Sequence, residues 1–439
     1  MNFAPFARRA RIIILAAVFW VLGPVSASAD LAVADIPDDS SLRAAILDSW
    51  FRAPPAEALS RKSERRLLDG GDTVEIRIEQ GKDEFMVVLA RERDGRFPAW
   101  SQGSWVLYRR RSDGSPTRIR VFLRSDPYAY IQFRPGGAGR TVLDAVAYGA
   151  YLARGAVVSQ AFDRLLSLPL SRALSSAGSS FPIRYFEAES GDYADARFLR
   201  EAIRSRLPEL SYADDGAFDV GGRPVFIETL EPQGEKAGLN CSGFAKWVVD
   251  GMLRPLTGRR LGIAELKAPM GERGTSFSEP YEDALDPYFG LDWTRNLAAA
   301  AAAAVRGSGS AALSEIEVRQ GAVAALRLSG DPNSQRSYLP YMKDVGFAME
   351  GLKATLFGLA VDEPGRMYLA SINAEVGDEP RLRRHFHVAV LMPLFEEDGR
   401  FTVTVFESAA ETDFDAFVRR YPLMHANLVR LPVESTFAP

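Results

Sequence analysis

The sequence predicts an α+β protein, with a β-rich first half and a second half in which helices precede a group of strands. Apolar and polar residues alternate in five short segments between residues 73 and 133, as expected of half-buried strands. Between residues 194 and 359 several stretches have apolar residues at helical spacing, separated by irregular segments, and alternation returns between residues 366 and 433. The 439 residues are enough for two or three domains, each with its own core.

The first 29 residues have the pattern of a secretory signal peptide. Three arginines between residues 8 and 11 precede an apolar run over residues 12–22, and an Ala-Ser-Ala sequence ends at Ala29. The apolar run is too short to span a membrane comfortably, and no cysteine near the cleavage site can carry a lipid. We therefore expect an exported protein, periplasmic or extracellular, that does not span a membrane.

The charge and the cysteine content restrict the possible functions. The formal net charge is −4, and the chain has no long basic tract, so nucleic-acid binding is disfavoured. Cys241 is the only cysteine. Exported proteins meet an oxidising environment in which structural cysteines come in pairs, so chemistry explains a lone cysteine better than an internal disulfide does.

Residues 30–180 are predicted to form a small all-β domain followed by helices. Its strands are expected over residues 73–78, 84–90, 104–108, 118–123 and 129–133, in a sandwich or a barrel. The charged segment before them, residues 61–66, is predicted to be a solvated face. Residues 141–168 are predicted to be helical, ending before Pro169. A Ser-rich stretch over residues 175–180 marks the predicted domain boundary.

Aromatic residues on and beside these strands have two interpretations. Strand aromatics are commonly core residues, but a row of them on an open face can stack against sugar rings. Both interpretations stay open for Trp100, Trp105, Tyr108, Tyr128 and Tyr130.

Residues 181–439 are predicted to form a second domain. Its helices are expected over residues 194–207, from Cys241 to Pro255, through the seven alanines of residues 298–304, and over residues 345–359. Its strands are expected over residues 366–373, 386–394, 401–407 and 427–433. A turn signal between Glu396 and Arg400 indicates that the second and third of these strands pair antiparallel.

Cys241 stands at the predicted start of a helix. Asn240 is a good N-cap residue, and Phe244, Trp247 and Val248 follow at helical spacing. In the first turn of a helix, the unpaired backbone N–H groups and the positive end of the helix dipole stabilise a thiolate. This position favours a nucleophile over the small buried apolar residue that a free cysteine often is.

A thiolate nucleophile needs a base, and the base needs a polar group that orients it. Of the three histidines, His387 stands near the start of a predicted strand. Pairing about the turn near residue 397 places His387 across from position 407 or 408. Glu407 is therefore the predicted orienting residue.

Other polar residues near this strand offer alternatives. His385, two positions earlier and so on the same face of a regular strand, is a second candidate base, and Asn373 is a reserve orienting residue. His385 and His387 would make half of a metal site, but no third ligand is evident nearby, so no metal is expected. His425 is predicted to be structural.

Two short motifs carry a resemblance to a known family. The segment from Asn240 to Phe244, Asn-Cys-Ser-Gly-Phe, and the segment from His387 to Val390, His-Val-Ala-Val, resemble the signatures of NlpC-type papain-like cysteine peptidases. The resemblance covers the C-terminal half and implies a papain-like domain, with a helix packed on an antiparallel sheet. It makes residues 255–365 an insertion between the two motifs.

The resemblance also implies a reaction and a substrate. Cys241 becomes the nucleophile, His387 the base and Glu407 the orienting residue in thiol-dependent hydrolysis of peptide amides, typically in the stem peptides of peptidoglycan, with no cofactor. Two other functions remain open: a non-catalytic envelope-binding protein on the same scaffold, and an amidase or acyltransferase that acts on lipid or protein amides.

Overall fold

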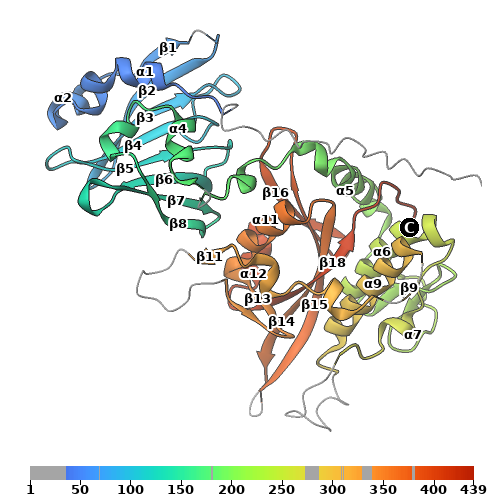
Figure 1. Ribbon diagram of the computed structural model, residues 1–439. Helices are drawn as coiled ribbons and strands as arrows, with labels where there is room; N and C mark the ends of the chain where they lie inside the picture. Colours follow the sequence, from blue (N-terminus) through green and yellow to red (C-terminus); the bar gives the residue numbers. More distant parts are fainter. Residues whose placement is uncertain are drawn as a thin grey trace, which may run out of the picture.

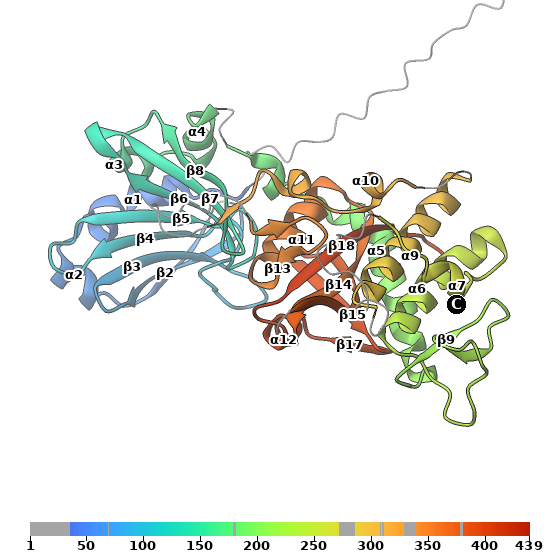
Figure 2. The same ribbon diagram turned by 90° about the horizontal axis from the view of Figure 1, so that it is seen from below.

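The computed structural model describes residues 36–68, 70–178, 181–271, 286–307, 309, 311–328, 339–377 and 381–439. The predicted signal peptide lies outside these residues. The described chain is a mixed α+β protein with two large antiparallel sheets, so the predicted α+β class is confirmed. Figures 1 and 2 show the two sheets in adjacent lobes, with α6 and α9 on the far side of the second sheet.

The N-terminal sheet has nine strands in the order β1-β2-β3-β4-β5-β6-β7-β8-β11. Its strands are β1 (Glu64–Leu67), β2 (Thr73–Gln80), β3 (Glu84–Arg91), β4 (Trp105–Arg110), β5 (Pro116–Val121), β6 (Ala129–Pro135), β7 (Thr141–Ala147), β8 (Ala150–Val158) and β11 (Arg327–Leu328). The five predicted strands are β2 to β6. They belong to one open antiparallel meander, and the predicted sandwich or barrel is wrong.

The helix predicted over residues 141–168 is wrong for residues 141–158, which form β7 and β8, whereas residues 162–165 are helical. Residues Tyr148 and Gly149 both have positive φ angles, 48° and 82°, and join β7 to β8 as a two-residue hairpin turn. Leu143, Ala145 and Ala147 alternate along β7 and are fully buried. Small and β-branched apolar residues in this segment fit either spacing, and the neighbouring strand β6 selects the extended form.

Part of the charged segment over residues 61–66, which was predicted to be a solvated face, forms a strand. Residues Glu64 to Leu67 form β1, the edge strand that pairs with β2, and their side chains are mostly exposed. The inner face of the sheet is covered by short helices: α1 (Ser40–Ala45), η2 (Leu47–Phe51), α2 (Pro55–Ser60), α3 (Phe162–Leu165) and α4 (Leu170–Ser175).

The aromatic residues considered for sugar stacking do not all lie on one face of the N-terminal sheet. Trp105 is 3% exposed and belongs to the inner core, whereas Tyr128 is 61% exposed at the end of the sheet. Tyr108 and Tyr130 lie on the outer face, where the Arg120 guanidinium stands 5.2 Å and 4.4 Å from their ring centres. The two tyrosine rings are therefore already in contact with an arginine.

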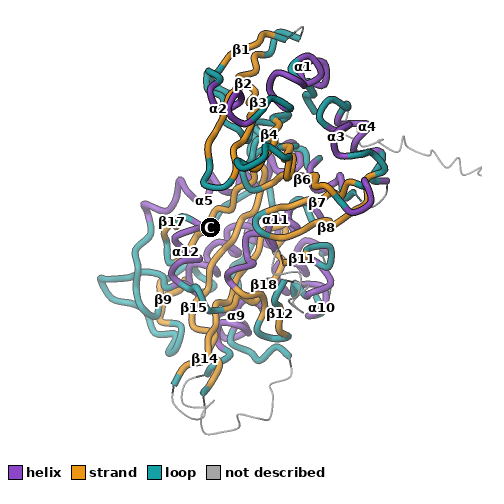
Figure 3. Tube along the Cα trace, turned by 90° about the vertical axis from the view of Figure 1, so that its left-hand side faces the viewer, coloured by secondary structure: helices purple, strands orange, loops and turns teal. Residues whose placement is uncertain are grey.

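The C-terminal sheet has seven strands in the order β12-β13-β18-β14-β15-β16-β17. Its strands are β12 (Tyr341–Met342), β13 (Gly346–Ala348), β14 (Arg366–Val376), β15 (Leu382–Phe395), β16 (Phe401–Glu407), β17 (Ala410–Thr412) and β18 (His425–Pro432). The four predicted strands are β14, β15, β16 and β18. In Figure 3 the strands β12, β14 and β15 of this sheet lie below β1 to β4 of the N-terminal sheet.

Helices cover both faces of the C-terminal sheet. The long helices are α5 (Ala194–Arg206), α6 (Cys241–Thr257), α9 (Phe289–Arg306) and α11 (Leu352–Asp362). Along β15, Val388 and Val390 face the core that contains α6 and α9, and Ala389 and Leu391 face the core that contains α11. The sheet is buried on both sides, which explains the continuous apolar run in β15.

Two predicted helix boundaries need correction. Helix α6 passes Pro255 and ends at Thr257, where Gly258 adopts a left-handed conformation with φ 73°. The helix predicted over residues 345–359 begins instead at Leu352, because Gly346 (φ 99°) starts the short strand β13 against β18.

The segment predicted to be an insertion is part of both lobes. Helix α9 packs on α6 and on β14, β15 and β18, and β11 adds a ninth strand to the N-terminal sheet next to β8. Strands β12 and β13 extend the C-terminal sheet beyond β18. Among the described residues, no helix is both long and apolar enough to span a membrane.

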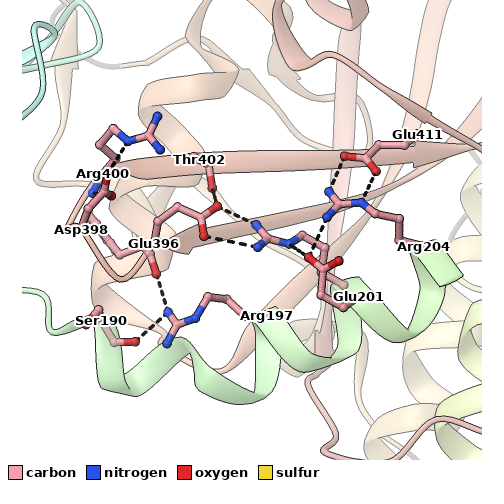
Figure 4. A network of polar contacts seen from close by, with 11 residues as sticks. Ser190, Arg197, Glu201, Arg204, Glu396, Asp398, Arg400, Thr402 and Glu411 are labelled. Carbon is pink, nitrogen blue, oxygen red and sulfur yellow. Dashed lines mark hydrogen bonds and ion pairs between the residues drawn. The ribbon is translucent and has the colours of Figure 1, made fainter. Parts of the chain in front are cut away.

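Helix α5 fixes the hairpin of β15 and β16. Arg200 pairs with Glu396 in the turn of the hairpin (2.6 Å), and Arg204 forms two hydrogen bonds with Glu411 on β17 (2.6 and 2.7 Å). Arg197 donates to the Phe395 carbonyl (2.7 Å). Figure 4 shows Arg197 and Arg204 of the helix facing Glu396 and Glu411. The turn before β16 and the strand β17 that pairs with the end of β16 are thereby tied to α5.

Candidate active site

Cys241 is the first residue of α6, as predicted. The Asn240 side chain caps the helix by accepting a hydrogen bond from the Gly243 N–H (2.8 Å), and its amide donates to the Asp214 carbonyl (3.1 Å). Trp293 of α9 donates to the Ser242 carbonyl (2.9 Å). These contacts hold the helix start, and with it the backbone of the partly buried Cys241, in one place.

The glycine of the cysteine motif is required by close packing. A methyl group on Gly243 would overlap the carbonyl oxygen of Gly216, which belongs to β9 (Gly216–Phe218). The same Gly216 carbonyl accepts a hydrogen bond from the Asn240 N–H (3.1 Å). A residue with a side chain at position 243 would push the helix start away from β9 and displace Cys241.

A bulge in β15 separates the two histidines that the sequence places on one face. Opposite β14, His387 pairs with Ile372 and His385 pairs with Asn373, so Phe386 is the extra residue. Ile372 and Asn373 are consecutive and point to opposite faces of the sheet, and the two histidines do the same. The prediction that they share a face is wrong.

His387 and Glu407 are brought together. The His387 Nε2 atom lies 2.6 Å from Glu407 Oε2, and the carboxylate is nearly buried. The observed register pairs Val390 with Phe406, so its continuation places Glu407 opposite Ala389 rather than opposite His387. Ala389 and His387 are two positions apart, and Glu407 therefore reaches the imidazole along the diagonal of the ladder.

The electrostatics of the three groups favour an ion pair. Burial raises the pKa of the Cys241 thiol, but hydrogen bonding to the His387 ring and its charge outweigh burial and lower the pKa. Burial opposes protonation of His387, yet its partners Cys241 and Glu407 raise its pKa to about 9. Burial also disfavours the Glu407 carboxylate, but hydrogen bonds from His387 and Thr412 bring its pKa to about 2.

These shifts define the charge state near neutral pH. Glu407 is ionised, His387 is protonated on both ring nitrogens, and its Nε2–H donates to Glu407. The His387 ring also interacts with Cys241, and its other nitrogen, Nδ1, is not the one bonded to Glu407. A thiolate next to an imidazolium is the resting state from which a cysteine nucleophile attacks.

The other candidate residues have different surroundings. His385 Nδ1 lies 2.9 Å from the Ser371 hydroxyl, and burial, with the charges of Arg295 and Arg383, lowers the pKa of His385 to about 3. It is therefore neutral and is not bonded to Glu407. The Asn373 amide donates to the Val345 carbonyl and accepts from Arg383, so it does not orient His387.

The third histidine, His425, lies in the sheet away from the candidate site. His425 begins β18 and pairs with Ala348 and Asn373 in the sheet, away from Glu407. Within the described ranges, no group of three or more His, Cys, Asp or Glu side chains is arranged to hold a metal ion.

Cys241 and His387 open into one pocket of about 540 Å³. The strand β15, the starts of α6 and α9, and the loop around β9 and β10 (Pro224–Phe226) contribute to it. Its lining includes three carboxylates and one arginine: Asp214, Glu228, Asp286 and Arg384. The thiol is thus accessible to a substrate of several atoms rather than sealed in the core.

Three residues of the site were not identified from the sequence. Thr412 and Arg420 both donate to Glu407 Oε1 (2.7 and 2.6 Å), and the Tyr421 ring lies 5.8 Å from the His387 ring. Asp413 is a good N-cap residue and indicates the helix α12 (Phe414–Arg420). Nothing in the local pattern indicates that the end of this helix returns to the histidine.

The comparison with known proteins gives a match in the N-terminal part of the chain, outside the candidate site. A family model described as a domain of unknown function (DUF8515) matches residues 32–185. This stretch contains β1 to β8 and ends before Cys241. No match was found among curated proteins or among solved structures.

Proposed function

We propose that this protein is an exported cysteine hydrolase that cleaves peptide amide bonds. The observation that carries the proposal is the 2.6 Å hydrogen bond between His387 and Glu407, with His387 and Cys241 lining the same pocket. A lone cysteine with only a structural role does not need an oriented base. The packing of α6 on an antiparallel sheet supports a papain-like catalytic domain.

In the proposed reaction, the Cys241 sulfur attacks the amide carbonyl carbon and forms a C–S bond. The His387 imidazolium gives its proton to the leaving nitrogen as the C–N bond breaks, which leaves a thioester. Neutral His387 then takes a proton from water, and the hydroxide attacks the thioester carbonyl so that the C–S bond breaks. The backbone N–H of Cys241, at the start of α6, is one donor for the oxyanion.

The proposed substrate is the stem peptide of peptidoglycan or another peptide of the envelope. The resemblance of the Asn-Cys-Ser-Gly-Phe and His-Val-Ala-Val motifs to NlpC-type peptidases supports this class. An exported location supports it as well, because the leader pattern would bring the enzyme to the wall.

Incubation with muropeptides tests the proposal. We expect the mature protein to convert a muropeptide into two products whose masses add up to the substrate plus one water, as measured by mass spectrometry. Boiled protein and the Cys241→Ala variant serve as controls. If muropeptides remain intact while lipid or protein amides are cleaved, the substrate class is wrong and the reaction type stands. If no amide is cleaved and Cys241 reacts slowly with iodoacetamide near neutral pH, the hydrolase proposal fails.

A further inference from the structure

Glu407 has a second cationic partner besides the candidate base. Its Oε2 atom accepts from His387, and its Oε1 atom accepts from Thr412 (2.7 Å) and from Arg420 Nη1 (2.6 Å). The Glu407 side chain is 5% exposed, whereas the Arg420 side chain is 50% exposed. One buried carboxylate therefore joins an internal imidazolium to an arginine that reaches the solvent.

The carboxylate would stay in place without the arginine. Glu407 ends β16, which pairs with β15 on one side and with β17 on the other, and Thr412 of β17 donates to it. β17 is itself tied to α5 through Glu411 and Arg204. Removal of Arg420 should thus change the charge around Glu407 more than its position.

A full negative charge beside a base has a cost for catalysis. A carboxylate stabilises imidazolium, which helps to form the thiolate but makes the imidazolium a weaker acid toward the leaving amine. A neutral orienting residue avoids this problem. Here the orienting group is charged, and the neighbouring arginine offsets that charge.

We infer that Arg420 is a positioning residue that acts through Glu407: it takes up part of the carboxylate charge and so lets the His387 imidazolium release its proton. In the proposed hydrolase, Arg420 would thus adjust the acidity of the His387 base. The catalytic meaning of this inference rests on the proposed function, but the titration that tests it does not. Other groups that act on the same pair are Cys241 of α6 and Tyr421, which follows α12 and contacts the His387 ring.

The proton affinity of His387 tests this directly. With three histidines in the chain, the His387 ring signals can be assigned by NMR with a His387→Ala variant and followed against pH. In the wild type we expect an apparent pKa of about 9. In Arg420→Gln we expect it to rise by about half a pH unit to one unit, because a cation near the imidazolium is lost.

Matched variants separate charge from structure. Arg420→Lys keeps the charge and should titrate close to the wild type. Arg419→Gln removes the neighbouring arginine, which is 72% exposed and whose closest acidic partner is Asp413 (4.0 Å), and should leave the His387 titration unchanged. High salt should move the wild type toward Arg420→Gln, because a half-exposed charge is screened. This last measurement needs no variant, so it holds even if Arg420→Gln folds poorly.

An unchanged His387 titration in Arg420→Gln would overturn the inference. A lower pKa would also overturn it, since it would mean that Arg420 only holds Glu407 in place. Failure of the wild type to cleave any amide would instead contradict the proposed function, and the titration would still report on Arg420. If the wild type is active, the alkaline limb of its pH–rate profile should move upward in Arg420→Gln by the same amount as the NMR titration.

Discussion

Replacing Cys241 or His387 with alanine is expected to lower kcat on a cleavable peptide amide by about a thousandfold or more. The first variant removes the nucleophile, and the second removes the only ring hydrogen-bonded to Glu407 within the described residues. Because both groups act in the same step, the double variant should be hardly slower than either single one.

His425, which lies away from the candidate site, provides the control for this prediction. His425→Gln should keep kcat and KM within about twofold of the wild type, because His425 lies in the β18 ladder and does not line the Cys241 pocket. Circular dichroism and thermal unfolding would show that the alanine variants are folded. Full activity in both Cys241→Ala and His387→Ala would contradict the assignment of these two residues.

A second large effect is expected on stability, from an ion pair inside α6. Lys246 Nζ lies 2.6 Å from Asp250 Oδ2, one helical turn away, and both side chains are almost completely buried. Asp250 Oδ1 also accepts from the Leu261 N–H (2.8 Å), which closes the loop after the helix. Lys246→Met should lower the free energy of unfolding by about 3–5 kcal/mol, because it leaves a buried carboxylate without its cation.

The double variant Lys246→Met with Asp250→Asn separates the charge from the contact. Asparagine keeps the acceptor for the Leu261 N–H but removes the charge, so we expect it to recover at least half of the lost stability in urea unfolding. Burial already raises the pKa of Asp250. A folded-state pKa above the unfolded value means that Lys246→Met becomes less destabilised as the pH falls and Asp250 is protonated. A double variant no more stable than the single one would contradict this.

The features of the site that depend on residues close together in the sequence were predictable. Asn240 and the residues after it fix a capped helix with Cys241 at its start, and these signals lie within a few positions of one another. The pairing of the His387 strand with the Glu407 strand was also predictable, since a short turn joins them. The catalytic roles of the three residues stay predictions.

The features that depend on contacts between residues far apart in the sequence could not be predicted. The bulge at Phe386, which turns His385 and His387 to opposite faces, arises from the pairing of β15 with β14 and leaves no mark in the alternation. The support of Glu407 by Thr412 and Arg420 depends on where β17 and α12 return. The segment over residues 141–158 contains small apolar residues that fit a helix or a strand, and the extended form is selected by the pairing of β7 with β6 and β8 and of β8 with β11.

The central claim is that Cys241 is a thiolate paired with His387, and the pH dependence of iodoacetamide labelling tests it most directly. Cys241 is the only cysteine, so the labelling rate reports on one group. In the wild type we expect fast labelling at about pH 6, well below the ordinary thiol pKa of about 8.5, and in His387→Ala we expect the rate to follow an ordinary thiol. Equal, slow labelling of both proteins at pH 6 would contradict the ion pair and the function built on it.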